Sequence, residues 1–145
     1  MQGLEKLKPL SLLVLRFALG AIFVYHGYPK LFTHTRESMQ GFVHMGFPGY
    51  FAYISGVIEF FGGLMLAAGL FTRIAALLLA GEMVVALWHV HGLFIAPLEV
   101  QNYEFPLILA AACFSLATLG AGLVSFDHLI FREGGRSPKK SKRRD

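Results

Sequence analysis

The fold is decided by residues 50 to 95, which read YFAYISGVIEFFGGLMLAAGLFTRIAALLLAGEMVVALWHVHGLFI. A helix of about 20 apolar residues crosses the hydrocarbon core of a bilayer, because each residue adds about 1.5 Å of length. The stretch is long enough for two such helices, at residues 50–70 and 73–95, with only Phe71 and Thr72 between them. A connection this short predicts an antiparallel hairpin of two membrane-spanning helices.

Two more apolar segments flank this hairpin, at residues 10–32 and 104–124. The chain of 145 residues is 55% hydrophobic and 15% charged, and its mean hydropathy is +0.58. These values are too apolar for an ordinary soluble domain. We therefore predict an all-α protein, an integral membrane four-helix bundle that occupies residues 1–131 as one domain. Residues 35–49 are amphipathic, and we expect a short helix there at the membrane interface.

Basic residues are distributed unevenly about the four spans. Lys6, Lys8, Arg73 and the C-terminal basic residues fall on one side, so the positive-inside rule predicts that both termini are cytoplasmic. Residues 132–145 are expected to form a disordered basic tail. We expect this tail to bind the surface of anionic membrane lipids rather than nucleic acid. Its clustered basic residues are Lys139, Lys140, Lys142, Arg143 and Arg144.

Besides Arg73 and Glu104, which begin two of the predicted spans, four charged residues lie within the spans: Arg16, Lys30, Glu59 and Glu82. Each charge near the middle of a bilayer costs on the order of 2.5 to 3.5 kcal/mol, so each should face the interior of the bundle and find a partner. Counted along the helices, Arg16 lies about 9 Å, Glu82 about 14 Å and Glu59 about 17 Å from the cytoplasmic end. An extended arginine could reach either glutamate. We predict one buried network of two bases and two acids, which is either a structural ion-pair network or a proton relay.

Four other residues are candidates for a pocket or a ligand site: His26, His89, Trp88 and Glu104. The two histidines come out level, at about 24 Å from the cytoplasmic end. With Glu59 they have the side-chain types of a metal site, and as a pair they could be axial haem ligands. The Glu-x-x-His pattern of di-iron bundles is missing, so metal and haem are the weaker interpretations. The aromatic ring of Trp88 fits an interfacial belt or a quinone headgroup pocket.

Seven short motifs follow one another along the chain. They are LRFALG at 15–20, HGYPKL at 26–31, GFP at 46–48, EFFGG at 59–63, GLFTR at 69–73, YE at 103–104, and GAG followed by SFD at 120–127. In this combination the chain resembles the DoxX family of small bacterial membrane proteins. The resemblance implies the bacterial inner membrane as location, and association with membrane oxidoreductases such as thiosulfate:quinone oxidoreductase or with oxidative-stress defence. It places the family's polar signature on Arg16, Lys30, Glu59, Arg73 and Glu104, and it supplies no catalytic mechanism.

Three functions are compatible with these features. The first is a subunit of a quinone-linked redox system, in which Glu59 and Glu82 relay protons and redox enzymes are the partners. As an enzyme it would be a quinone-linked oxidoreductase subunit that depends on a partner or a bound cofactor for electrons, because Cys113 is the only thiol. The second is a small solute or ion transporter, for which four spans would need a homo-oligomer. The third is a membrane scaffold whose tail and loops recruit soluble enzymes.

Overall fold

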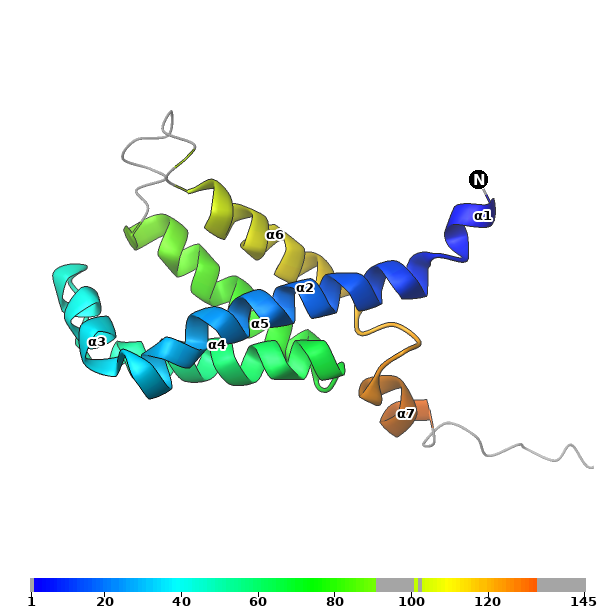
Figure 1. The fold of residues 1–145 in the computed structure, drawn as a ribbon. Helices are drawn as coiled ribbons and strands as arrows, with labels where there is room; N and C mark the ends of the chain where they lie inside the picture. The colour runs from blue at the N-terminus through cyan, green and yellow to red at the C-terminus, as the bar shows by residue number, and fades with distance from the viewer. Residues whose placement is uncertain (1, 91–100, 102, 133–145) are drawn as a thin grey trace, which may run out of the picture.

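The computed structural model describes residues 2–90, 101 and 103–132 of the chain (Figure 1). Every regular element in this described part is helical, which confirms the predicted fold class. In η1 and η2 the helix has the wide π form, whose hydrogen bonds span one residue more than those of an α-helix. The elements are α1 (Gln2–Glu5), α2 (Lys8–Tyr28), η1 (Pro29–Thr33), α3 (Thr35–His44), α4 (Phe51–Ala68), α5 (Thr72–Val85), η2 (Ala86–Val90), α6 (Glu104–Leu119) and α7 (Phe126–Arg132).

Three helical segments are long and apolar enough to cross a membrane, and they are Lys8–Thr33, Phe51–Ala68 and Thr72–His89. They lie close to the expected spans at 10–32, 50–70 and 73–95, although residues 91–95 are outside the described part. α6 is a shorter apolar helix of 16 residues. The basic tail is also outside the described part from residue 133 onward.

The fourth helix ends earlier than the expected span of 104–124. α6 stops at Leu119, and the chain turns at Gly120 and Gly122, whose φ angles are 83° and 79°. Glycine adopts positive φ without the steric cost that other residues meet. Apolar residues in this turn, such as Leu123 and Val124, raised the hydropathy of a segment that is not helical. Hydropathy alone therefore overestimated the length of this helix.

The α4–α5 hairpin is the centre of the bundle, and each of its two helices packs against one further long helix. α2 crosses against α4, and α6 runs beside α5 (Figure 1). α3 lies at one end of the bundle, while α1 and α7 lie at the opposite end (Figure 1). The buried apolar core lies between α2, α4, α5 and α6 and includes Phe23, Leu66, Leu79 and Leu116.

The contact between α2 and α4 depends on glycines. A Cβ added to Gly20 would lie 2.7 Å from the carbonyl oxygen of Gly63, and one added to Gly27 would lie 2.5 Å from the backbone nitrogen of Phe60. Such distances leave no room for a side chain. Small residues let membrane helices approach closely, because packing drives their association. The two backbones are thereby held in direct contact along the depth of the bundle.

The distribution of polar and apolar side chains is the reverse of that in a soluble protein. Arg16 is 2% exposed and Glu59 is 4% exposed, whereas Phe17, Leu77 and Ile108 are each more than half exposed. Exposed apolar surface on helices of this length is what a bilayer covers. The chain is a membrane protein with several apolar spanning helices.

Candidate functional site

A cavity of about 520 Å³ lies between α2, α4, α5 and α6, close to the end of the bundle where α3 lies. Most of its walls are aliphatic and aromatic, and a few polar groups converge in it. Pockets that bind small molecules have this composition, since apolar walls supply contact area and the polar groups fix orientation. The polar lining residues are His26, Lys30, Ser55, Glu59 and Glu82.

Lys30 reaches the cavity from η1. The backbone N–H of His34 donates to the carbonyl oxygen of Pro29 at 2.8 Å, which closes the wide π turn. Pro29 has no N–H to donate, so the α-helical ladder of α2 cannot continue unchanged through this point. π segments of this kind are frequent at functional sites. The turn sets the position from which the Lys30 side chain enters the bundle.

The Lys30 ammonium group connects two residues of α4. Its Nζ donates to Glu59 Oε2 at 2.5 Å and to Ser55 Oγ at 2.7 Å. The Ser55 hydroxyl in turn donates to Glu82 Oε1 on α5. We call these four side chains the Lys30 cluster. It joins η1, α4 and α5 through side chains alone and forms the polar part of the cavity wall.

Glu82 is the member of the Lys30 cluster that is incompletely bonded. Its Oε2 atom is buried and has no hydrogen-bond partner among the described residues. The direction of the chain from Lys30 through Ser55 makes Glu82 Oε1 an acceptor, so a proton on this carboxyl belongs on Oε2. Buried polar atoms are normally bonded, so an unbonded carboxylate oxygen in a cavity wall is a place where a ligand or a water molecule can bind. Oε2 can accept from a ligand, or donate to one when protonated.

Arg16 lies in a different place from the other predicted network residues, which corrects the expected four-residue network. Its guanidinium donates to four backbone carbonyls, and no glutamate of the described part of the chain is among its partners. Depth along a helix was estimated from the sequence, but the direction of the side chain was not. Arg16 and its acceptors form what we call the Arg16 cluster. The acceptors are Leu66 at 3.0 Å, Ala67 at 3.3 Å, Ala121 at 2.6 Å and Val124 at 2.7 Å.

Separating Arg16 from the glutamates changes the charge balance of the cavity. The expected network paired two bases with two acids, but Lys30 is the one base that the described structure bonds to Glu59 and, through Ser55, to Glu82. The second acid therefore has no basic partner of its own. Such a carboxyl is suited to exchanging a proton with a ligand, because its charge is not fixed by an ion pair.

Asp127, from α7, completes the structure around the Arg16 cluster. Its two carboxylate oxygens accept from the backbone N–H groups of Phe71 at 2.7 Å and Thr72 at 2.9 Å, at the start of α5. The first N–H groups of a helix have no partner within the helix, so this carboxylate acts as a cap supplied from a distant segment. Its backbone N–H also donates to Gly69 at 2.8 Å. The sequence motifs around 69–73 and 120–127 thus serve to fasten α7 to the hairpin.

The other candidate residues are spread over several contacts. His26 lines the cavity, and its ring packs 5.9 Å from that of Phe105 between ring centroids. His89 packs instead on Phe47, at 4.5 Å. Glu104 begins α6 and is exposed, and Trp88 is 69% exposed; neither lines the cavity. Among the described residues, no three histidine, cysteine, aspartate or glutamate side chains are grouped as a metal site.

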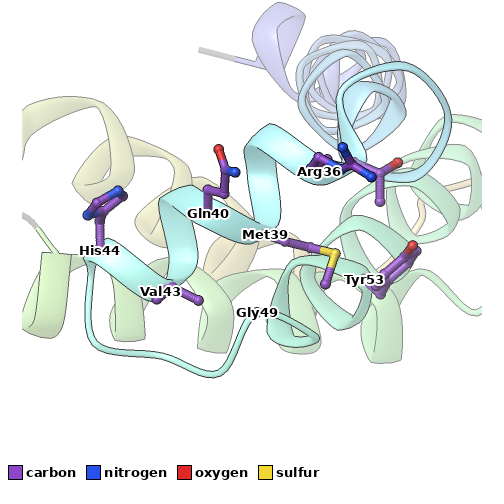
Figure 2. Close-up of a pocket in the computed structure, with 8 residues that line it drawn as sticks. Arg36, Met39, Gln40, Val43, His44, Gly49 and Tyr53 are labelled. Atoms are coloured by element: carbon purple, nitrogen blue, oxygen red, sulfur yellow. The ribbon is translucent and has the colours of Figure 1, made fainter.

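A second hollow, an open groove of about 540 Å³, lies between α3 and the start of α4. Met39 points from α3 towards Tyr53, while Gln40 and His44 project from other parts of the helix surface (Figure 2). The groove contains Arg36 as its one cation and has no buried charged cluster among its lining residues. The groove therefore lacks the buried charged cluster that the cavity beside Lys30 has.

Two residues in these clusters were missed from the sequence. Ser55 bridges Lys30 to Glu82, but a serine in a membrane span is too common to be singled out. Asp127 appeared in a motif without an assigned role. Its signal was a carboxylate in a short helix directly after a glycine turn, at 120–127.

The fold and site define an integral membrane helical bundle with a polar cluster in the wall of an apolar cavity. The chain belongs to the DoxX family, whose model matches residues 11–92, and this confirms the resemblance seen in its motifs.

Three relatives match most of the chain. "Putative oxidoreductase CatD" of Bacillus subtilis is 33% identical over 120 residues, which cover 83% of this chain and 87% of the relative. A Haemophilus influenzae protein without an assigned role is 31% identical over 137 residues, covering 92% of this chain and 100% of the relative. "Inner membrane protein YqjF" of Escherichia coli is 28% identical over 129 residues, covering 88% and 97%. No solved structure matches the chain.

Proposed function

We propose that this protein is a subunit of an inner-membrane redox system, and that its cavity binds the headgroup of a quinone. The observation that carries the proposal is the Lys30 cluster in the wall of an otherwise apolar cavity of about 520 Å³. The names of two relatives agree with it, since one is called an oxidoreductase and another an inner membrane protein. The location is proposed on the same basis.

The cavity offers what a quinone headgroup requires. The ring is flat and apolar, and aromatic side chains such as Phe42, Phe47 and Phe105 are present in the walls. Its two oxygens need donors in the oxidised form and acceptors in the reduced form. Lys30 is a donor of three hydrogen bonds and uses two of them on Ser55 and Glu59. The Glu82 carboxyl can take either role at Oε2.

The quinone supplies the redox chemistry, in which the ring gains two electrons and two protons and becomes a quinol. The residues of this chain handle the protons. Glu82 holds one proton at Oε2 and gives it to a ring oxygen, and after it is protonated again from water it supplies the second. In the reverse direction it accepts the two protons one at a time. Glu59 holds the Lys30 ammonium in place and keeps one cation beside the ring oxygens. Electrons come from a redox partner, because the chain has one cysteine and no thiol pair.

The first experiment measures the quinone-to-protein ratio of affinity-purified protein by mass spectrometry. We expect a near-stoichiometric quinone in the wild type and its loss in Glu82→Gln and Glu59→Gln. Glu104→Gln is the matched control, because this exposed carboxylate does not line the cavity. Retention of quinone in Glu82→Gln and Glu59→Gln, or no quinone in the wild type, would contradict the proposal.

The same purified protein separates the two other functions. Reconstitution in liposomes followed by a flux assay tests the transporter, which predicts uptake that depends on Glu82. Truncation after Phe131 tests the scaffold, which predicts loss of partner recovery without any change at the cavity. If the wild type retains quinone, and if neither uptake that depends on Glu82 nor loss of partner recovery is observed, the results support the redox function and neither of the other two.

A further inference from the structure

The cavity wall differs between its α2–α6 side and its α4–α5 side, which we call its two rims. On the side of α2 and α6, the rings of His26 and Phe105 are in contact, with 5.9 Å between their centroids. On the side of α4 and α5, the lining includes Gly81, and a Cβ added there would meet nothing within 4 Å. One rim is covered by aromatic rings, whereas the other has open space next to the backbone of α5.

Three apolar residues of α4 and α5 belong both to the cavity wall and to the exposed surface. Ile54, Leu78 and Val85 line the cavity and are 46%, 55% and 51% exposed. An apolar side chain that lines a cavity and also faces lipid marks a continuous apolar path between the two. Glu82, the residue that follows Gly81 along α5, lines the same cavity.

We infer that the ligand enters this cavity sideways from the lipid, through the rim that Gly81 leaves open between α4 and α5. The inference rests on the proposed function and adds the ligand class: an amphiphile dissolved in the bilayer, with a headgroup at Glu82 and an apolar tail along this rim. Gly81 is the specificity-determining residue, because the absence of a side chain there leaves room for the tail. Water-soluble compounds without a tail gain nothing from this rim.

The size of the cavity supports a ligand that is only partly enclosed. Pockets for small molecules have volumes of about 300 to 1,000 Å³, so about 520 Å³ encloses a headgroup and the beginning of a tail. The remainder of a long isoprenoid tail must leave the cavity. The exposed apolar side chains of Ile54, Leu78 and Val85 give it a surface that is as apolar as the lipid.

The experiment fills the rim and compares ligands with and without a tail. The full-length protein is reconstituted in lipid nanodiscs as wild type, Gly81→Ala, Gly81→Leu and Gly81→Trp. Binding is measured for decylubiquinone and menaquinone, which have tails, and for the tail-free ring compounds 2,3-dimethoxy-5-methyl-1,4-benzoquinone and menadione. Leu77→Trp is the matched control, since Leu77 is an exposed residue of α5 that does not line the cavity.

We expect Gly81→Trp to raise the Kd of the tailed quinones at least about tenfold, which corresponds to the loss of about 1.4 kcal/mol. The Kd of the tail-free rings should stay within about twofold, because a large side chain at 81 occupies the path of the tail. Leu77→Trp should bind like the wild type, and the Kd of the tailed quinones should rise in the order Gly81→Ala, Gly81→Leu, Gly81→Trp. Gly81→Leu also carries the test if the tryptophan variant does not fold.

Two results would overturn the inference while leaving the proposed function intact. If Gly81→Trp and Gly81→Leu bind tailed quinones like the wild type, the tail does not use this rim. If both ligand classes weaken equally, residue 81 contacts the headgroup rather than the tail. If the wild type binds neither class, the proposed function fails, and the inference that rests on it fails with it.

Discussion

The two buried polar clusters of this bundle are built in opposite ways. The Arg16 cluster joins one side chain to four backbone carbonyls, and Arg16 lines neither of the cavities described above. The Lys30 cluster joins side chains to one another in the wall of a cavity, and it leaves Glu82 Oε2 without a partner. A cluster whose bonds are complete stabilises the fold, whereas an incomplete one has capacity left for a ligand.

This difference assigns three residues of the polar signature, Arg16, Lys30 and Glu59, to two roles. Arg16 belongs to the structural cluster, close to the turn at Gly69 and the cap formed by Asp127. Lys30 and Glu59 belong to the cavity. Motifs that follow one another in the sequence thus contribute to different polar clusters of the bundle. Stability and ligand retention should respond separately when each cluster is changed.

The largest effect is expected at Arg16. Arg16→Met leaves four carbonyls without their charged donor, and we expect it to lower the free energy of unfolding by about 3 to 5 kcal/mol. Unfolding by sodium dodecyl sulfate in mild detergent micelles, followed by circular dichroism, measures this change. Arg16→Lys is the control that keeps the charge but lacks the planar fork, so it should recover only part of the loss. A stable Arg16→Met variant would remove the structural role of this cluster.

A second prediction concerns Gly27, where the helix bearing Lys30 touches α4. The Cβ of Gly27→Ala would lie 2.5 Å from the Phe60 nitrogen and 2.9 Å from the Gly56 oxygen. Both are backbone atoms, which can move only if a whole helix is displaced. We expect a loss of about 1 to 3 kcal/mol in the same unfolding assay.

Because α2 must also move away from α4, retained quinone should decrease together with stability in Gly27→Ala. Gly41→Ala is the matched control, since a Cβ there meets nothing within 4 Å. Unchanged quinone retention in a destabilised Gly27→Ala protein would show that the Lys30 cluster does not depend on this contact.

A smaller effect is expected at Asp127, which caps α5. Asp127→Ala removes the acceptor of two backbone N–H groups, and loss of a cap costs about 1 to 2 kcal/mol. Asp127→Asn retains one acceptor oxygen and should lose less. Quinone retention is expected to be unchanged in both, because the cap lies outside the cavity. A loss of quinone in these variants, with the helices intact, would contradict the assignment of separate roles to the two clusters.

The smallest effect on stability is expected at Glu82. Glu82→Gln keeps an oxygen that accepts from Ser55 and preserves the volume of the side chain, so the free energy of unfolding should change by less than about 1 kcal/mol. Quinone retention should nevertheless be lost. This profile is the opposite of that of Asp127→Ala, and the pair measured together is the sharpest comparison of the clusters. A Glu82→Gln protein as unstable as Arg16→Met would make both clusters structural.

The sequence predicts the helices of this fold well, because hydropathy depends only on composition along the chain. It also predicts that Arg16 and Glu59 are buried, since a charge within a span has to face the interior of the bundle. It does not predict the direction in which a long side chain extends, and Arg16 extends to carbonyls that every residue possesses. Backbone acceptors carry no sequence signal. The predicted ion pair between Arg16 and the glutamates was therefore wrong.

The cavity was predictable only in part. Lys30 and Glu59 were identified from their charge, and the structure bonds them to each other. Ser55 and Gly81 carry no charge, and their importance comes from position: one lies between two charged groups, and the other has empty space beside it. Position of this kind is a property of packed helices rather than of residue type.

The acceptors of Arg16 bear on how the protein is made. Ala121 and Val124 lie 105 and 108 residues after Arg16, so the ribosome produces them long after the first helix has left it. Until they arrive, that helix carries a charge in the bilayer that costs on the order of 2.5 to 3.5 kcal/mol. The first span to be synthesised is thus among the last to be secured. Arg16 therefore obtains its full set of four acceptors only after Val124 has been made.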